Sequence, residues 1–262
     1  MTEESICLYT NLFTLADKQV NTNLYVHMLL IWLKYVKEKG VLLSCDRLIL
    51  ILDTRTSDYL QQNYFFKNLI TGLYCKITLL TVPPPTSLLE GCLNRYKMML
   101  DYEQQFLIYL DVDVLIQSPL RSLVRGEDMK KKVQVHSEGL LENDNYGIHF
   151  KEKGEAVLQG VAGFSSGKFI LPSLEIRNEL FTRICSLGTD FNYYCLDQPL
   201  FNYAIYQLLT EKKIQLDVTL KQMISTNLHN YVKGKSILLD FCGEPGDAFF
   251  HIEKMVGFLC TN

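Results

Sequence analysis

Two aspartates, Asp111 and Asp113, stand at the end of the apolar run 106–110. The Phe, Leu, Ile and Tyr side chains of that run are typical of a buried strand, and residues two apart in extended backbone point to the same side. The two carboxylates therefore converge on one volume, where a cation would relieve their repulsion. Oxygen-only ligands favour a hard ion, so the pattern predicts an Mg²⁺ or Mn²⁺ site. The alternative is a chance pair of surface carboxylates, because a bare Asp-x-Asp triplet is common.

The residues around this pair predict the elements that must position it. Apolar runs at 6–10 and 48–52 flank a segment, 23–39, whose apolar residues recur at helical spacing and which ends at Gly40. Strand, helix and strand form a βαβ unit, whose right-handed crossover brings both strand ends to one sheet edge, where ligands bind. The sequence therefore predicts an α/β fold with a mostly parallel central sheet flanked by helices. The further predicted elements are helices at 64–70, 94–102 and from 197, and strands at 76–82, 106–110, 160–171 and 236–241.

Composition limits the class of protein. A net charge of −3 and a pI near 6.0 argue against a nucleic-acid-binding protein. The eight cysteines include no C-x-x-C pair, which favours free thiols in a reducing compartment. The first residues are acidic where a secretory signal is basic, and no apolar run reaches the ~18 residues that span a bilayer. We expect one domain over 1–262, cytoplasmic and without a transmembrane segment.

Three further stretches could contribute to a site, each with a simpler explanation. Arg95 on the helix at 94–102 could pair with a phosphate or carboxylate, or could be an exposed helix cation. The small residues of 160–167 allow the backbone to approach a ligand closely, or form a tight turn. Asp197 is an expected N-cap of the helix that follows. The polar segment 124–158 is expected to be mobile surface structure without functional residues.

Taken in chain order, five motifs resemble those of the glycogenin-like family 8 glycosyltransferases. These are retaining enzymes of the Rossmann-like GT-A fold that use nucleotide sugars. Each motif is short, but the five occur in the family's order over nearly two hundred residues. The motifs are Thr10-Asn11, Arg95 sixteen positions before Asp111, Tyr109-Leu110-Asp111-Val112-Asp113, Phe164-Ser165-Ser166-Gly167 and Asp197-Gln198-Pro199-Leu200-Phe201-Asn202.

The resemblance implies a role for each matching residue. It implies that Mn²⁺ or Mg²⁺ bridges the donor diphosphate, and that Asp197 and Gln198 act beside the transferred sugar. Metal ligands would be Asp111, Asp113 and Asp240. Residues that bind the UDP-sugar would be Thr10, Asn11, Arg95, Asp111, Val112, Ser165, Ser166, Gly243 and Lys254.

The chain departs from the family pattern at three of these positions. Ser165 stands where the family usually has Asn, which shortens a group that contacts the sugar. Asp240 stands where the family closes its metal site with His; a carboxylate is an acceptable ligand, and His251 or His229 is an alternative. The family's lysine is missing at its usual offset, and Lys254 is the nearest replacement.

The implied reaction moves a hexose or N-acetylhexosamine from a UDP-sugar to an acceptor hydroxyl with retained configuration. The acceptor could be a glycan, a glycolipid or a protein, and a homodimer is compatible with the family. The nucleotide-binding part would span about 1–115 and the acceptor part about 116–262. Three alternatives stay open: a catalytically impaired nucleotide-sugar-binding protein, an interaction domain, and a sugar nucleotidyltransferase, although residues 10–13 lack that last class's glycine-rich basic signature.

Overall fold

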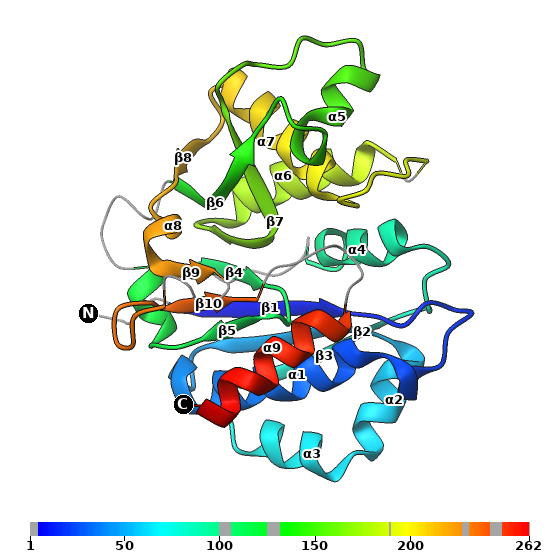
Figure 1. Cartoon of the computed structure of the whole chain (residues 1–262), viewed down its shortest axis with the longest axis vertical. Helices are drawn as coiled ribbons and strands as arrows, with labels where there is room; N and C mark the ends of the chain where they lie inside the picture. The colour runs from blue at the N-terminus through cyan, green and yellow to red at the C-terminus, as the bar shows by residue number, and fades with distance from the viewer. Residues whose placement is uncertain are drawn as a thin grey trace.

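The computed structural model describes residues 5–99, 106–124, 132–188, 190–226, 231–241 and 248–261. Most of its strands form one seven-stranded mixed sheet in the order β3-β2-β1-β4-β7-β6-β8 (Figure 1). The first four are parallel, whereas β7 runs antiparallel to both β4 and β6. The strands of this sheet are β1 Ile6–Leu12, β2 Arg47–Asp53, β3 Lys76–Val82, β4 Phe106–Leu110, β6 Lys132–Leu140, β7 Ala162–Leu171 and β8 Gln215–Asp217.

The central strands are mostly apolar and buried because helices cover both faces of the sheet. Alternate residues of β1 belong to two cores: Leu8 packs with α1, α3 and α9, whereas Tyr9 packs with α4, α6 and α7. Figure 1 shows α1, α2, α3 and α9 together at one side of the sheet and α5, α6 and α7 around β6 and β7 at the other. The helices are α1 Leu24–Tyr35, α2 Thr54–Gln62, α3 Tyr64–Thr71, α4 Leu88–Lys97, α5 Asp144–Glu152, α6 Leu174–Ser186, α7 Gln198–Thr210, α8 Leu220–Met223 and α9 Ala248–Thr261.

A second, three-stranded sheet brings distant segments to the end of β4. Its strands are β5 Val114–Ile116, β10 Leu238–Asp240 and β9 Ile224–Thr226, in that order. Asp240 pairs with Val114, the residue after the Asp-x-Asp triplet, so the chain near residue 240 lies beside residues 111–113.

The α/β class and the mostly parallel sheet are confirmed, and three local expectations differ from the structure. Residues 54–62, which were not expected to form an element, form α2, because Asp53 caps that helix by accepting from the N–H groups of Arg55 and Thr56. The helix expected at 94–102 begins earlier, as α4, where Ser87 accepts from the N–H of Glu90. Residues 100–105 lie outside the described residues.

The expectation of surface structure over 124–158 is wrong for much of that segment. β6 buries Val133 and Val135 against β7, and α5 packs on α7. Polar residues misled the prediction here because β6 alternates them with apolar ones and buries Gln134 and His136 together with Val133 and Val135.

Within the described residues, no helix combines the length and apolar character needed to cross a membrane.

Candidate functional site

A cleft opens at the carboxyl ends of β1 and β4. In the sheet, β2 and β3 lie on one side of β1, and β4 lies on the other side of β1. The direction in which strands are added therefore reverses between β1 and β4. Such a switch point is where ligands bind in open α/β sheets. The cleft has a volume of about 1230 Å³ and is lined by Asn11 at the end of β1, Arg95 of α4 and Asp111 after β4. This volume is enough for a ligand made of several chemical parts.

Asp111 follows β4 directly and is held by three neighbours. Its N–H donates to the carbonyl of Gly167 at 2.8 Å, the Tyr109 hydroxyl donates to its carboxylate, and Nη1 of Arg95 lies 3.5 Å from its Oδ1. Desolvation by the surrounding protein, together with the charge of Asp113, outweighs these contacts and raises the pKa of Asp111 to about 6. A further cation beside this carboxylate would therefore favour its ionised form.

Asp113 reaches the same cleft and has a histidine against it. Nδ1 of His251, on α9, lies 3.1 Å from Oδ2 of Asp113. The N–H of Phe241 donates to the carbonyl of Asp113 at 3.1 Å, which ties the end of β10 to this turn. The side chains of Asp111 and Asp113 are 34% and 17% exposed, so both carboxylates are accessible from the cleft.

Arg95 links two carboxylates at the base of the cleft. Its guanidinium is buried, with the Nε atom 3.8 Å from Oδ2 of Asp197 and its carbon centre 4.6 Å from the centre of the Tyr109 ring. The Tyr96 hydroxyl donates to the same oxygen of Asp197 at 2.5 Å. Asp197 does occupy the N-cap position of α7, but its side chain makes no capping hydrogen bond. The expected cap is therefore wrong in its chemistry, because Arg95 and Tyr96 hold the carboxylate instead.

The small residues of β7 line the cleft next to Asp111. The carbonyl of Ser166 accepts from Nη1 of Arg95 at 3.0 Å, and its N–H donates to Oε1 of Gln198 at 3.4 Å. At Gly167 a Cβ atom would collide with the carboxylate of Asp111. Glycine is therefore needed here so that β7 can pack beside Asp111.

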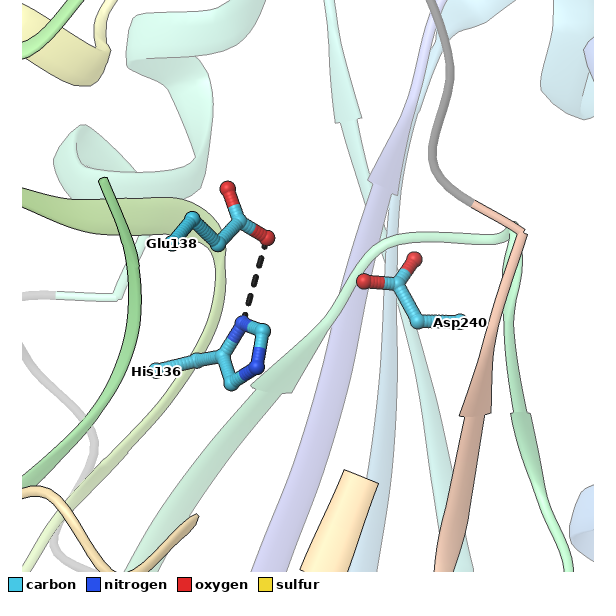
Figure 2. Close-up of side chains that lie close together, drawn as sticks. All are labelled: His136, Glu138 and Asp240. Carbon is cyan, nitrogen blue, oxygen red and sulfur yellow. Dashed lines mark hydrogen bonds and ion pairs between the residues drawn. The ribbon is translucent and has the colours of Figure 1, made fainter. Parts of the chain in front are cut away.

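Asp240 lies in a second charged cluster that also lines the cleft (Figure 2). His136 and Glu138 project from β6 and Asp240 from the end of β10, and ligand atoms of these three side chains lie within 4.8 Å of one another. The ammonium of Lys168, on β7, contacts the carboxylate of Asp240 and lies 2.5 Å from Oε1 of Glu138. The same Glu138 oxygen lies 3.1 Å from Nδ1 of His136.

The charges in this second cluster are balanced differently from those around Asp111. Desolvation disfavours the Glu138 anion, but Lys168 and His136 together lower its pKa to about 2. Desolvation also raises the pKa of Asp240, and Lys168 works against that shift. For Lys168 itself, the two carboxylates overcome desolvation and raise its pKa. Lys168 is therefore a permanent cation inside the protein.

No model of a known protein family matches this chain, and neither does any curated protein sequence. The function is therefore argued from the geometry of the cleft.

The structure brings most of the predicted site residues together. Those that line the cleft are Asn11, Arg95, Asp111, Val112, Asp113, Ser165, Ser166, Asp197, Gln198, Asp240 and His251. Two others lie elsewhere. Thr10 is fully buried within β1, and Lys254 places its ammonium 3.7 Å from the centre of the Phe250 ring on α9. Gly243 and His229 lie outside the described residues.

Sequence analysis did not identify His136, Glu138 and Lys168. Each is a charged or titratable side chain within a strand, and Lys168 directly precedes the buried run Phe169-Ile170-Leu171. A lysine at a buried strand position requires a partner, which is the signal that could have drawn attention to it. Its partners come from β6 and β10, and no local pattern predicts that pairing.

The donor atoms near Asp111 and Asp113 fit a divalent metal ion better than those near Asp240. Both aspartates offer partly exposed oxygens, and Asp111 has a raised pKa. The Asp240 side chain is 2% exposed, and its carboxylate contacts Lys168. That all three aspartates share one ion stays a prediction. In the structure Asp240 already has a cation beside it, the Lys168 ammonium.

Proposed function

We propose that this protein is a metal-dependent, retaining glycosyltransferase of the GT-A type. It would move a hexose or N-acetylhexosamine from a UDP-sugar to an acceptor hydroxyl. The observation that carries the proposal is the convergence of Asn11, Arg95, Asp111 and Asp113 on one cleft at the strand-order switch point. This is where an open α/β sheet binds a nucleotide.

A hydrogen-bond acceptor in the cleft supports recognition of the base. Asn11 lines the cleft and is 8% exposed, and its Nδ2 donates to the carbonyl of Gly91 on α4 at 2.9 Å. That bond fixes the amide, while its Oδ1 is buried and has no hydrogen-bond partner among the described residues. A buried acceptor without a partner is costly, and a ligand N–H such as that of the uracil imide would satisfy it.

Asp111 and Asp113 would hold the metal ion. When bound, Mn²⁺ or Mg²⁺ supplies Lewis-acid stabilisation of the charge that develops on the leaving diphosphate. The chain's own contribution is to keep the two carboxylates in place: Tyr109, Arg95 and the carbonyl of Gly167 fix Asp111 by the contacts described above. Fixed oxygens of this kind need no reorganisation during the reaction.

Asp197 and Gln198 would act on the sugar side of the cleft. A carboxylate near the anomeric carbon can stabilise the positive charge that forms as the glycosidic bond breaks. Arg95 and Tyr96 orient the Asp197 carboxylate, and Gln198 accepts from the N–H of Ser166 and so connects α7 to β7. Arg95 thus positions Asp111 and Asp197 at the same time.

A second candidate function is binding of a nucleotide sugar without turnover. One observation favours it: Asp240, which would complete the metal site by resemblance, contacts the ammonium of Lys168 instead. Release of UDP distinguishes the two functions, because a binding protein retains affinity for the donor and does not cleave it.

The test is release of UDP from a panel of UDP-sugars with Mn²⁺ or Mg²⁺, with water as the fallback acceptor. We expect one donor to be cleaved only with metal, and the rate to fall at least about a hundredfold in Asp113→Asn. Asp58→Asn is the matched control, because Asp58 is an exposed aspartate of α2 outside the cleft. Metal-dependent UDP binding without release would favour the second candidate, and absence of both would contradict the proposal.

A further inference from the structure

The cluster of His136, Glu138 and Asp240 has the ligand types and spacing of a metal site. One imidazole and two carboxylates, from β6 and β10, place ligand atoms within 4.8 Å of one another. Figure 2 shows His136 and Glu138 side by side with Asp240 facing them across a gap. Imidazole and carboxylate are suitable ligands for Mn²⁺ and other divalent ions.

A side chain of this chain already supplies a cation at that place. The Lys168 side chain is 3% exposed, and its ammonium contacts one oxygen of Glu138 and one of Asp240. A desolvated ammonium is stable only when carboxylate partners lie close to it, and Glu138 and Asp240 meet that condition. A divalent ion bound between the same two oxygens would lie next to the ammonium and be repelled by it.

We propose that Lys168 is a resident cation that takes the place of a metal ion between Glu138 and Asp240. The cluster then binds no divalent ion while Lys168 is present, and metal is confined to the Asp111 and Asp113 side of the cleft. The proposal that Lys168 keeps a divalent ion out of this cluster rests on the geometry of the cluster alone. The consequence for catalysis, that transfer uses the metal at Asp111 and Asp113 without Asp240, rests on the proposed function.

Direct contact between Lys168 and a donor diphosphate is a less suitable role for this ammonium. Its positive charge is already offset by contacts with two carboxylates. An ammonium paired in this way attracts a phosphate less than a free one. Lys168 therefore acts on the carboxylates and not on the ligand.

The experiment is a titration of the full-length protein with Mn²⁺, followed by electron paramagnetic resonance of the free ion. Glu138→Gln alone should change Mn²⁺ affinity less than about twofold relative to the wild type, because Glu138 holds Lys168 and no metal. Lys168→Met, which removes the ammonium and keeps both carboxylates, should bind one additional Mn²⁺. Adding Glu138→Gln to Lys168→Met should weaken that additional site at least about tenfold.

Lys76→Met is the matched control, since Lys76 is an exposed lysine at the start of β3, and it should gain no Mn²⁺ site. If Lys168→Met does not fold, Lys168→Gln serves in its place, because its amide still donates hydrogen bonds to the carboxylates without a charge. If the neutral variant that folds gains no Mn²⁺ site, the proposal is overturned. It is also overturned if Glu138→Gln alone lowers Mn²⁺ affinity tenfold relative to the wild type.

These outcomes are separable from those that test the proposed function. If no UDP-sugar is bound or cleaved and Lys168→Met still gains a Mn²⁺ site, the transferase proposal fails and the role of Lys168 stands. If a UDP-sugar is cleaved and Glu138→Gln abolishes Mn²⁺ binding, the transferase stands and the resident cation fails.

Discussion

Two groups of carboxylates line the same cleft, and their charges are balanced in different ways. Glu138 and Asp240 share the Lys168 ammonium; the pKa of Glu138 is lowered to about 2, whereas desolvation raises that of the more deeply buried Asp240. Among the described residues, the cation beside Asp111 is the Arg95 guanidinium at 3.5 Å, which is shared with Asp197, and the pKa of Asp111 is raised to about 6. The first group is completed by folding, whereas we propose that the second takes a cation from outside. A motif of acids therefore indicates a metal site only where the protein's own cations leave the carboxylates accessible, as at Asp111 and Asp113 but not at Asp240.

The largest expected effect is the loss of the resident cation. In metal-free buffer, Lys168→Met should lower the free energy of unfolding by about 3–5 kcal/mol, because two carboxylates lose their buried partner. Urea denaturation measures this, with Lys76→Met as the control that should change stability by less than about 0.5 kcal/mol. A loss below about 1 kcal/mol would mean that the Lys168 contacts contribute little, and the contrast between the two groups would disappear.

A change at Gly167 should act on the other group. In Gly167→Ala the new methyl group would collide with the Asp111 carboxylate and displace it, at a cost of about 1–3 kcal/mol. We expect Mn²⁺ affinity to fall about tenfold or more while the unfolding transition remains cooperative. Gly257→Ala is the control, since a Cβ there has open space on α9. Unchanged Mn²⁺ affinity would place the ion away from Asp111.

The Tyr109 hydroxyl provides a finer test of the Asp111 charge. It donates to the carboxylate and so favours the ionised form, which means that Tyr109→Phe should raise the pKa of Asp111 above its value of about 6. A titration of the carboxylate carbon by nuclear magnetic resonance would report the shift. A pKa that stays the same or falls would contradict the hydrogen bond.

The smallest expected effect is on the pH dependence of stability without metal. Asp111 titrates at about 6 in the folded protein and near 3.8 when unfolded, so folding binds a proton between these values. The contribution of Asp111 to stability is therefore complete below about pH 4 and is lost as pH rises through about 6. Asp111→Asn should remove this component from a comparison of unfolding free energies at pH 5 and pH 7.5. A wild-type component of the opposite sign would contradict the raised pKa.

The sequence predicted the first parallel strands of the sheet well. β1, β2 and β4 are mostly apolar runs because they are covered on both faces, and Asp111 and Asp113 stand out as charges where such a run ends. Local pattern is sufficient there because parallel strands bring their carboxyl ends to one edge.

The Lys168 cluster could not be predicted in the same way. His136, Glu138, Lys168 and Asp240 come from three strands that are far apart in the sequence, and their contact depends on the antiparallel packing of β7 beside β6 and on the position of β10. The contacts of Asp197 were also hidden, since its partners Arg95 and Tyr96 are about a hundred residues away. Long-range pairing of charges leaves no periodic signal in a single sequence.

The most direct test of the account is a crystal structure with UDP and Mn²⁺, with the ion located by its anomalous scattering. We predict one manganese peak beside Asp111 and Asp113 next to the diphosphate, the uracil at Asn11, and Lys168 still between Glu138 and Asp240. A peak between Glu138 and Asp240 with Lys168 displaced, or a cleft that takes up no nucleotide, would contradict it.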